Sequence, residues 1–284
     1  MGIGVLRASP NRGQVRSRRL RSAGVGPAGL DPGSPRRPSI APKKKRAAQR
    51  PCAQGAGGAL SFRPPKETGL ITSALLNTIP NNHHGFGTAA ELVPAVLQPV
   101  WDERPNKRQV HGTRAVHIVE VRQPVGDADA FHTATPGIPV SVITADCVPL
   151  LLARRDGGHV AAVHAGWRGL YDGIIGQTLA QLGGGDWVAA IGPAICAACY
   201  EVGAELADSF VQRFGAAIVP TYRHLDLRAL AQRQLEEGGV AAIEHVGGCT
   251  HCARADDGSF LFRSYRRGDR NSQQHAGLFI HHDH

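Results

Sequence analysis

The sequence predicts an α/β or α+β fold in which helices cover a mixed β-sheet. Three observations point to this class. Short β-branched apolar segments alternate with helix-like segments along most of the chain. Residues 138–153 form a nearly continuous apolar run, which is typical of a strand buried on both faces. Helix-like segments end at glycines, such as those at 183–185. Because strands and helices alternate, we expect a single domain, and the chain contains no internal repeat.

Most elements can be placed in chain order. Residues 81–87 are turn-prone and lead into a short extended segment, whereas Pro94 and Pro99 limit residues 89–104 to a short helix or an irregular connection. Strands are expected at residues 116–121, 138–153 with an interruption at 145–147, 159–164, 187–191, 240–246 and 260–262. Helices are expected at residues 170–182, 201–214 and 225–237, and a Gly- and Arg-rich tail follows the last strand.

Basic residues are concentrated in the first quarter of the chain. Residues 1–66 contain 15 Lys and Arg and one acidic residue, whereas residues 67–284 contain 17 Lys and Arg and 22 Asp and Glu. The first segment is rich in Gly, Pro, Ser and Ala and nearly lacks aromatic residues, so burial cannot offset its ordering entropy. We therefore predict a disordered basic extension at 1–66 and a folded domain at 67–284. Such an extension would bind nucleic acid only non-specifically, through its charge.

Membrane spans and secretion signals are not expected. No apolar stretch approaches about 18 uninterrupted residues, because Asp146 breaks the longest candidate, residues 140–153. The N-terminus lacks a compact apolar segment followed by a small-residue cleavage site. These features favour a cytoplasmic protein that does not associate with membranes.

Three residues at expected strand ends have side chains that bind metals. They are His111, Cys147 and His164, separated by 36 and then 17 residues. Two imidazoles and a thiolate suit Zn²⁺ and leave its fourth tetrahedral position open, as in catalytic sites. Water bound there would lose its proton near neutral pH. The spacings alone do not show that the three residues converge, and each is equally compatible with a structural role in the core.

Weaker signals surround these residues. Arg168 follows His164 in a Gly-Trp-Arg-Gly turn that opens an expected helix, where it could either bind phosphate or remain solvated. Residues 264–267, Ser-Tyr-Arg-Arg, offer hydroxyls and two more cations. No GxGxxG motif follows an expected strand, and GxxxxGK[ST] is absent from the sequence, so dinucleotide and P-loop functions lack support.

Two CxxC pairs present a competing interpretation. Cys196 with Cys199 and Cys249 with Cys252 are the half-sites of a Cys₄ structural zinc site. However, 49 residues separate the two pairs, which is well beyond the usual ~15–20 residues. The spacing therefore favours core thiols, or a thiol pair without a metal, over a shared zinc site.

Seven sequence blocks occur together in the order found in one protein family. They are Gln109-Val110-His111, Ala145-Asp146-Cys147-Val148-Pro149, His164-Ala165-Gly166-Trp167-Arg168-Gly169, Ile191-Gly192-Pro193-Ala194-Ile195, Cys199-Tyr200-Glu201-Val202-Gly203, Cys249-Thr250 and Ser264-Tyr265-Arg266-Arg267. From about residue 71 to residue 280, the chain resembles the YfiH-type laccase-domain proteins. These are purine nucleoside phosphorylases that were long described as multicopper polyphenol oxidases.

The resemblance implies a zinc-dependent enzyme that uses phosphate to cleave the N-glycosidic bond of purine nucleosides. Its substrates would be adenosine, inosine and S-methyl-5'-thioadenosine, and its products a free base and ribose 1-phosphate. Family members are also credited with adenosine deamination. In this family His111, Cys147 and His164 would hold the zinc ion, with copper as the alternative metal.

Further roles follow from the same resemblance. Arg168 would bind phosphate, and His84 and Arg266 would contribute to substrate binding. Asp146 would orient a ligand or move a proton, or else serve as a structural turn carboxylate. Family members usually carry a Gly-rich loop and an Asn-Arg-containing helix before the Gln-Val-His block, and residues 88–108 contain no counterpart. If that segment binds substrate, activity is expected to be reduced or lost.

Two other functions are weighed against this one. A copper-dependent polyphenol oxidoreductase needs many His and Cys ligands, usually in His-x-His pairs, and the sequence has only one such pair, at His282 and His284. The third function is a non-enzymatic polyanion-binding protein that acts through residues 1–66.

Overall fold

The computed structural model describes residues 70–282, so the predicted disordered extension at residues 1–66 lies outside the described residues. The strands are β1 (Asn82–Phe86), β2 (Asn106–Arg108), β3 (Ala115–His117), β4 (Pro124–Asp127), β5 (Ala130–Thr133), β6 (Val140–Thr144), β7 (Val148–Arg154), β8 (Val160–Ala165), β9 (Trp187–Ile191), β10 (Ala242–His245) and β11 (Gln274–Ile280). The α-helices are α1 (Trp167–Asp172), α2 (Ile174–Leu182), α3 (Ala204–Phe214) and α4 (Leu227–Glu237). Short 3₁₀ helices are η1 (Leu76–Thr78), η2 (Ala95–Glu103), η3 (Ala197–Cys199) and η4 (Ala216–Ile218). No described helix is both long and apolar enough to span a bilayer.

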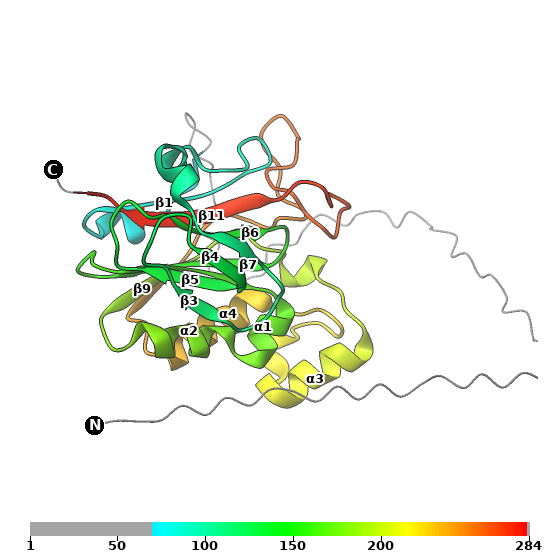
Figure 1. Ribbon diagram of the computed structural model, residues 1–284. Helices are drawn as coiled ribbons and strands as arrows, with labels where there is room; N and C mark the ends of the chain where they lie inside the picture. Colours follow the sequence, from blue (N-terminus) through cyan, green and yellow to red (C-terminus); the bar gives the residue numbers. More distant parts are fainter. Residues whose placement is uncertain (1–69, 283–284) are drawn as a thin grey trace, which may run out of the picture. The chain divides into compact units, whose positions relative to one another are not determined.

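The predicted mixed α+β class is confirmed, and the elements form three layers (Figure 1). The middle layer is a six-stranded mixed sheet in the order β10-β9-β7-β8-β5-β3. A three-stranded antiparallel sheet, β1-β11-β6, lies on one face, and the α-helices lie on the other. β2 and β4 form a separate two-stranded pair.

Side chains of the middle sheet alternate between two hydrophobic cores. In β7, Leu150 and Leu152 pack with residues of the helices, whereas Leu151 and Ala153 pack with residues of the small sheet. All four are buried, because successive side chains of a strand point to opposite faces. The continuous apolar run therefore does mark a strand buried on both faces. Its interruption at 145–147 is the corner where the chain leaves β6 in the small sheet and enters β7 in the middle sheet.

The helix predicted at residues 170–182 is in fact two helices. Gly173 separates them with φ of 90°, a left-handed conformation that glycine adopts without steric cost. α1 also begins earlier than predicted, at Trp167. The other two predicted helices are confirmed as α3 and α4, and three predicted strands are confirmed as β8, β9 and β10. The strand predicted at 116–121 ends already at His117.

Two predictions near the end of the described chain are wrong. Residues 260–262 form no regular strand, and Phe260 makes an isolated bridge to Arg254 instead. β11 lies within the segment that was predicted as a tail, and it is the central strand of the small sheet. Gly277 permits this close packing, because a Cβ there would lie 2.8 Å from the Cβ of Ser141. In the sequence, a glycine that is required by close packing cannot be distinguished from a glycine in a turn, so this strand was not predicted.

Strand register brings three connections together at one end of the middle sheet. Val148 at the start of β7 pairs with Ala165 at the end of β8, so Cys147 lies beside the end of β8. β5 is antiparallel to β8 and parallel to β3. The loop that enters β3, which carries His111, therefore reaches the same end as His164.

The N-cap of α4 provides a test of local stability. The Asp226 side chain accepts a hydrogen bond from the backbone N–H of Ala229 at 3.0 Å. Asp226→Ala removes this acceptor, so the free energy of unfolding should fall by about 1 kcal/mol. Asp208→Ala, at an exposed position inside α3, should not lower it. Urea unfolding followed by circular dichroism measures both, and equal losses would contradict the capping role.

Candidate metal centre

Two histidines and a cysteine converge where the three connections meet. The ligand atoms of His111, Cys147 and His164 all lie within 4.8 Å of one another, and Cys147 Sγ is 3.8 Å from His111 Nε2. The two imidazole rings are nearly perpendicular, with centroids 4.8 Å apart. His164 is buried and His111 is exposed, so solvent reaches the group from one side. The fold therefore brings together the three residues that the sequence singled out.

A buried carboxylate that the sequence did not indicate supports two of these ligands. Asp129 is fully buried, and its Oδ1 accepts a hydrogen bond from His164 Nδ1 at 2.8 Å. Its oxygens also accept from the backbone N–H groups of Val110, His111 and Gly112. Because Nδ1 of His164 carries the proton in this bond, the lone pair of Nε2 is left for a metal ion. Carboxylates orient metal-binding histidines in this way in many proteins.

Electrostatics favour the metal-binding form of Cys147. Burial raises the pKa of its thiol, but the nearby His164 and His111 rings lower it more, and the net pKa lies below the usual range. Burial lowers the pKa of His164, but Cys147 and Asp129 raise it more, and the net pKa lies above the usual range. The pair thus favours a thiolate beside an imidazolium. The thiolate is the form that binds metals, and metal binding displaces the imidazole proton.

Two residues of this region have left-handed backbone conformations, which are uncommon outside glycine. His111 has φ of 60° and Asp146 has φ of 95°. Hydrogen bonds hold both conformations, since the His111 N–H donates to Asp129 and both carboxylate oxygens of Asp146 accept hydrogen bonds. Strained conformations that the surrounding structure holds in place are common at functional sites.

Asp146 connects the loops around the group. Its Oδ1 accepts from the Thr250 hydroxyl at 2.7 Å, and its Oδ2 accepts from the Arg266 backbone N–H at 2.7 Å. Its backbone carbonyl accepts from the Ile195 N–H at 3.0 Å. Both oxygens of the buried carboxylate are therefore in use, which supports a positioning role over proton transfer. Thr250 holds the Asp146 carboxylate in place. In the sequence, Thr250 was noted only as part of the Cys-Thr block.

Two exposed arginines border the same region. Arg168 lies 5.0 Å from the centre of the Trp167 ring, and Arg266 lies 5.1 Å from the centre of the Tyr200 ring. Tyr200 links them to the candidate metal ligands: burial and then the charge of Cys147 raise the pKa of its phenol, while both arginines act in the opposite sense. The phenol thus stays protonated and can donate a hydrogen bond. In the sequence, only the position of Tyr200 in the Cys-Tyr-Glu-Val-Gly block could have indicated that it lies near the candidate metal centre.

His84, which was expected to line the site, is not brought into this group. It lies on β1, where its Nε2 accepts a hydrogen bond from the Ser73 backbone N–H at 2.8 Å and its Nδ1 lies 3.2 Å from the Asn82 amide nitrogen. Burial lowers its pKa to about 4, although Glu244 on β10 acts in the opposite sense. His84 is thus held by contacts with Ser73 and Asn82 and is not one of the three metal-ligand candidates, and its role in substrate binding stays a prediction.

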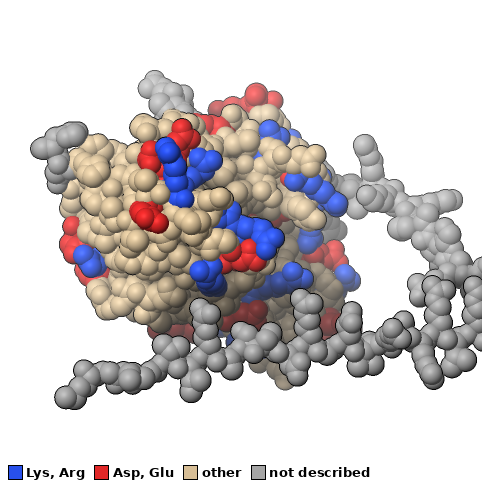
Figure 2. Space-filling view, in the orientation of Figure 1, with Lys and Arg blue, Asp and Glu red and all other residues tan. Residues whose placement is uncertain are grey.

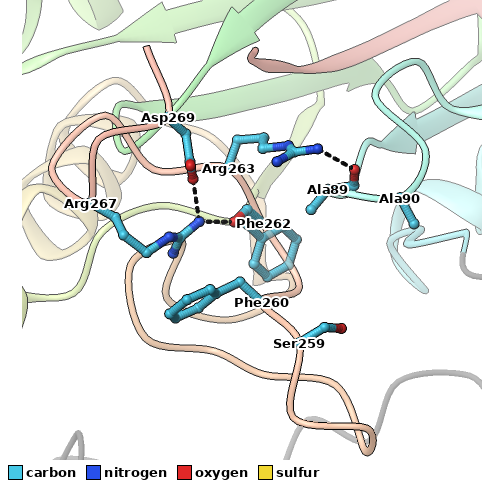
Figure 3. Close-up of a pocket in the computed structure, with 8 residues that line it drawn as sticks. All are labelled: Ala89, Ala90, Ser259, Phe260, Phe262, Arg263, Arg267 and Asp269. Atoms are coloured by element: carbon cyan, nitrogen blue, oxygen red, sulfur yellow. Dashed lines mark hydrogen bonds and ion pairs between the residues drawn. The ribbon is translucent and has the colours of Figure 1, made fainter. Parts of the chain in front are cut away.

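A hollow of about 350 Å³ lies beside the loop at residues 259–269. Figure 3 shows Arg267 directed at the Asp269 carboxylate and Arg263 directed at the Ala89 carbonyl. The hollow is lined by Ala89, Ala90, Ser259, Phe260, Phe262, Arg263, Arg267 and Asp269. Because the three metal-ligand candidates are not among these residues, the hollow is not part of the candidate metal centre.

Residues 70–282 contain two further groups of metal-ligand side chains. His117, His132 and His159 lie at the opposite end of β8, with His132 Nδ1 3.0 Å from His159 Nε2 and with the rings of His117 and His132 stacked. The other group is the four cysteines of the two CxxC pairs, whose sulfur atoms lie within 4.8 Å of one another. Their long spacing favoured separate core thiols, but the fold brings the two pairs together.

Charged side chains of both signs are interspersed on the face shown in Figure 2. Among the described residues, Arg108 forms an ion pair with Asp127 and Arg155 forms one with Asp186. On this face of residues 70–282, basic side chains do not form a broad patch that could bind a polyanion. The alternative of polyanion binding was based on residues 1–66, which are outside the described residues.

A layered α+β fold with an accessible His₂Cys group defines a candidate metalloprotein. The family model described as "Multi-copper polyphenol oxidoreductase laccase" matches residues 95–281. This is more than half of the chain, and the chain belongs to this family. The resemblance to the YfiH-type laccase-domain proteins is thereby confirmed.

Individual relatives agree with this assignment. The purine nucleoside phosphorylase YfiH of Shigella flexneri is 36% identical over 190 residues, which cover 64% of this chain and 74% of the relative. The adenosine deaminase RL5 of an unknown prokaryotic organism is 34% identical over 178 residues, which cover 58% and 67%. The crystal structure of Neisseria meningitidis protein NMB0706 is similar with a TM-score of 0.58 and 32% identity, covering 66% of this chain and 78% of that one.

Gly166→Ala should weaken metal binding at this centre. A Cβ at this position would lie 2.8 Å from His111 Cδ2 and 3.2 Å from Cys147 Sγ, so the ligands would have to move apart. We expect the Zn²⁺ affinity of the centre to fall about tenfold or more, as measured by competition with a chromophoric chelator. Gly176→Ala in α2, where a Cβ would meet nothing within 4 Å, is the matched control. Unchanged affinity in Gly166→Ala would contradict the ligand set.

His84 should make folding sensitive to acid. Its pKa is about 4 in the folded chain and 6.5 in the unfolded chain, so between these pH values the unfolded chain binds more protons. The free energy of unfolding therefore falls as the pH is lowered through this window. In His84→Gln this fall should be smaller by on the order of 3 kcal/mol. Urea unfolding at a series of pH values measures it, and an identical pH dependence in the variant would refute the assignment.

Proposed function

We propose that the chain is a zinc-dependent purine nucleoside phosphorylase that also deaminates adenosine. The observation that carries this proposal is the convergence of His111, Cys147 and His164 on one accessible point, which Arg168 and Arg266 border. The names of two relatives, a purine nucleoside phosphorylase and an adenosine deaminase, support the two reactions. The substrates would be adenosine, inosine or S-methyl-5'-thioadenosine, together with phosphate.

The donor set fits zinc. Two imidazoles and a thiolate are ordinary zinc ligands, and three protein ligands leave a fourth position open. The hydrogen bond from His164 to the buried Asp129 supplies the outer support that such ligands need. When bound, zinc would contribute Lewis acidity at the open position. The same donors also accept copper, so metal analysis of the purified protein has to decide between the two ions.

In phosphorolysis, residues of the chain have to position the phosphate, stabilise the leaving purine and hold the loops of the site in place. A phosphate oxygen attacks the anomeric carbon, the N-glycosidic bond breaks, and the bonding electrons pass to the purine. Arg168 and Arg266 would hold the phosphate dianion in position for this attack. The protonated phenol of Tyr200 would donate a hydrogen bond to the leaving purine as negative charge develops on it. Asp146 would act indirectly, by holding the loops that carry Thr250 and Arg266.

Adenosine deamination has similar requirements. Water takes the place of phosphate as the nucleophile and adds to the purine ring, and ammonia then leaves. A positioned nucleophile and a proton donor are the needs of this reaction. The open side of the candidate centre and the phenol of Tyr200 would meet both of them, so one site serves the two reactions.

Nucleoside cleavage gives a direct test. The purified full-length chain incubated with inosine and phosphate should release hypoxanthine, and omission of phosphate should abolish the release. Cys147→Ala should lose at least about 10²-fold in kcat/KM, because a metal ligand is removed, whereas Cys52→Ala should keep full activity. Arg168→Ala should raise the KM for phosphate about tenfold. Its matched control is Arg213→Ala, which removes another exposed arginine that lies over an aromatic ring.

One outcome would replace the proposal. Absence of hypoxanthine release, combined with copper-dependent oxidation of phenols, would favour the oxidoreductase that the family description names. Weak release that keeps the same dependence on Cys147 and Arg168 would instead indicate that residues 88–108 lack a substrate-binding segment. That region consists largely of η2, with Pro99 inside it, and the short strand β2.

A further inference from the structure

Four cysteine sulfurs meet outside the candidate active centre. The Sγ atoms of Cys196, Cys199, Cys249 and Cys252 all lie within 4.8 Å of one another. A tetrahedral zinc ion with Zn–S distances of about 2.3 Å separates its sulfur ligands by about 3.8 Å, so only a small contraction is needed. We propose that these four cysteines bind a second, structural zinc ion.

Backbone pairing explains how distant CxxC pairs come together. Ala194 and Cys249 form an isolated parallel bridge, and the Thr250 N–H donates to the Ala194 carbonyl at 3.2 Å. This bridge brings the segment after β9 beside the segment after β10. The 49 residues between the pairs contain α3, α4 and β10. Because β10 pairs with β9, the chain returns beside the first loop despite this length.

Each pair is also shaped by a turn of its own. The Cys199 N–H donates to the Cys196 carbonyl at 3.0 Å, and the Ala253 N–H donates to the Cys249 carbonyl at 2.9 Å. These turns direct both sulfurs of a CxxC pair to the same side, as in known structural zinc sites. Between the pairs, the Cys196 N–H donates to Cys249 Sγ at 3.3 Å. Hydrogen bonds from the backbone to sulfur stabilise the thiolate charge.

A partly buried arginine, Arg228, has an unpartnered Nε and lies close enough to the cluster to interact with its charge. Arg228 of α4 has a buried Nε with no hydrogen-bond partner within the described residues, although its Nη2 donates to His245 Nδ1 at 3.1 Å. Burial lowers the pKa of Arg228, and Asp226, Cys249 and Cys196 act in the opposite sense. A zinc ion with four thiolates has a net charge of −2. The adjacent guanidinium would offset part of this charge.

The location of the cluster indicates a structural role. All four coordination positions would be filled by protein, which leaves no place for a substrate. The residue after Cys249 is Thr250, whose hydroxyl holds Asp146, and the residue after Cys199 is Tyr200. The ion would therefore fix two loops that support the His₂Cys centre, without contacting substrate itself.

Metal analysis of the full-length chain tests this inference without any activity assay. The wild-type protein should bind one more equivalent of zinc than Cys252→Ser or Cys196→Ser, whereas Cys52→Ser should bind as much as the wild type. Cys147→Ala should lose a different equivalent, so the double variant Cys147→Ala/Cys252→Ser should lose both. Because each centre is removed separately, failure of the proposed function at the first centre would leave this result unaffected.

Cobalt substitution of the wild-type protein keeps the test decisive even if the cysteine variants fail to fold. A tetrathiolate site should give the intense sulfur-to-cobalt charge-transfer bands of four thiolate ligands, well above those of the single thiolate at Cys147. X-ray absorption at the zinc edge should likewise show a site with four sulfur ligands. Bands of one thiolate only, or disulfide bonds within the cluster in mass spectra of the unreduced protein, would overturn the proposal.

Discussion

The buried carboxylate of Asp129 is the interaction on which the candidate metal centre depends. This single carboxylate accepts hydrogen bonds from the three backbone N–H groups at residues 110–112 and from the imidazole of His164. Removal of these partners would leave an uncompensated charge in the interior, which is strongly unfavourable. The loop before β3 is therefore bound to the end of β8 by an electrostatic requirement, whereas apolar packing holds the layers of the sheet.

The sequence predicted those elements of the fold whose burial is visible in the local pattern of apolar residues. The apolar run through β7 indicated a strand covered on both sides, because both hydrophobic layers need side chains from it. β11 could not be recognised in the same way, since Gly277 looks like a turn residue and its reason is the close approach of Ser141 on another strand. Gly173 ends α1 through a left-handed conformation that a helical periodicity does not reveal.

The candidate site shows the same limit. His111, Cys147 and His164 could be named from residue type and from the family resemblance. Asp129 could not, because Asp127 two residues earlier is chemically identical, and only the structure shows Asp127 exposed and paired with Arg108. The convergence of the four cysteines could not be expected from the sequence for a related reason. Sequence separation measures only the length of the intervening chain. The two loops meet because β9 and β10, the strands that lead into them, pair in parallel and the Ala194–Cys249 bridge continues this pairing.

Chain order adds a consequence for synthesis of the protein. β1 and β6 do not pair with each other, and both pair with β11, which is synthesised after all the other described strands. Until then, the backbone groups of β1 and β6 have no partner in their sheet, and such unpaired strand edges promote association with other chains. Protection of the nascent chain by a chaperone is therefore most useful in the interval before residues 274–280 emerge.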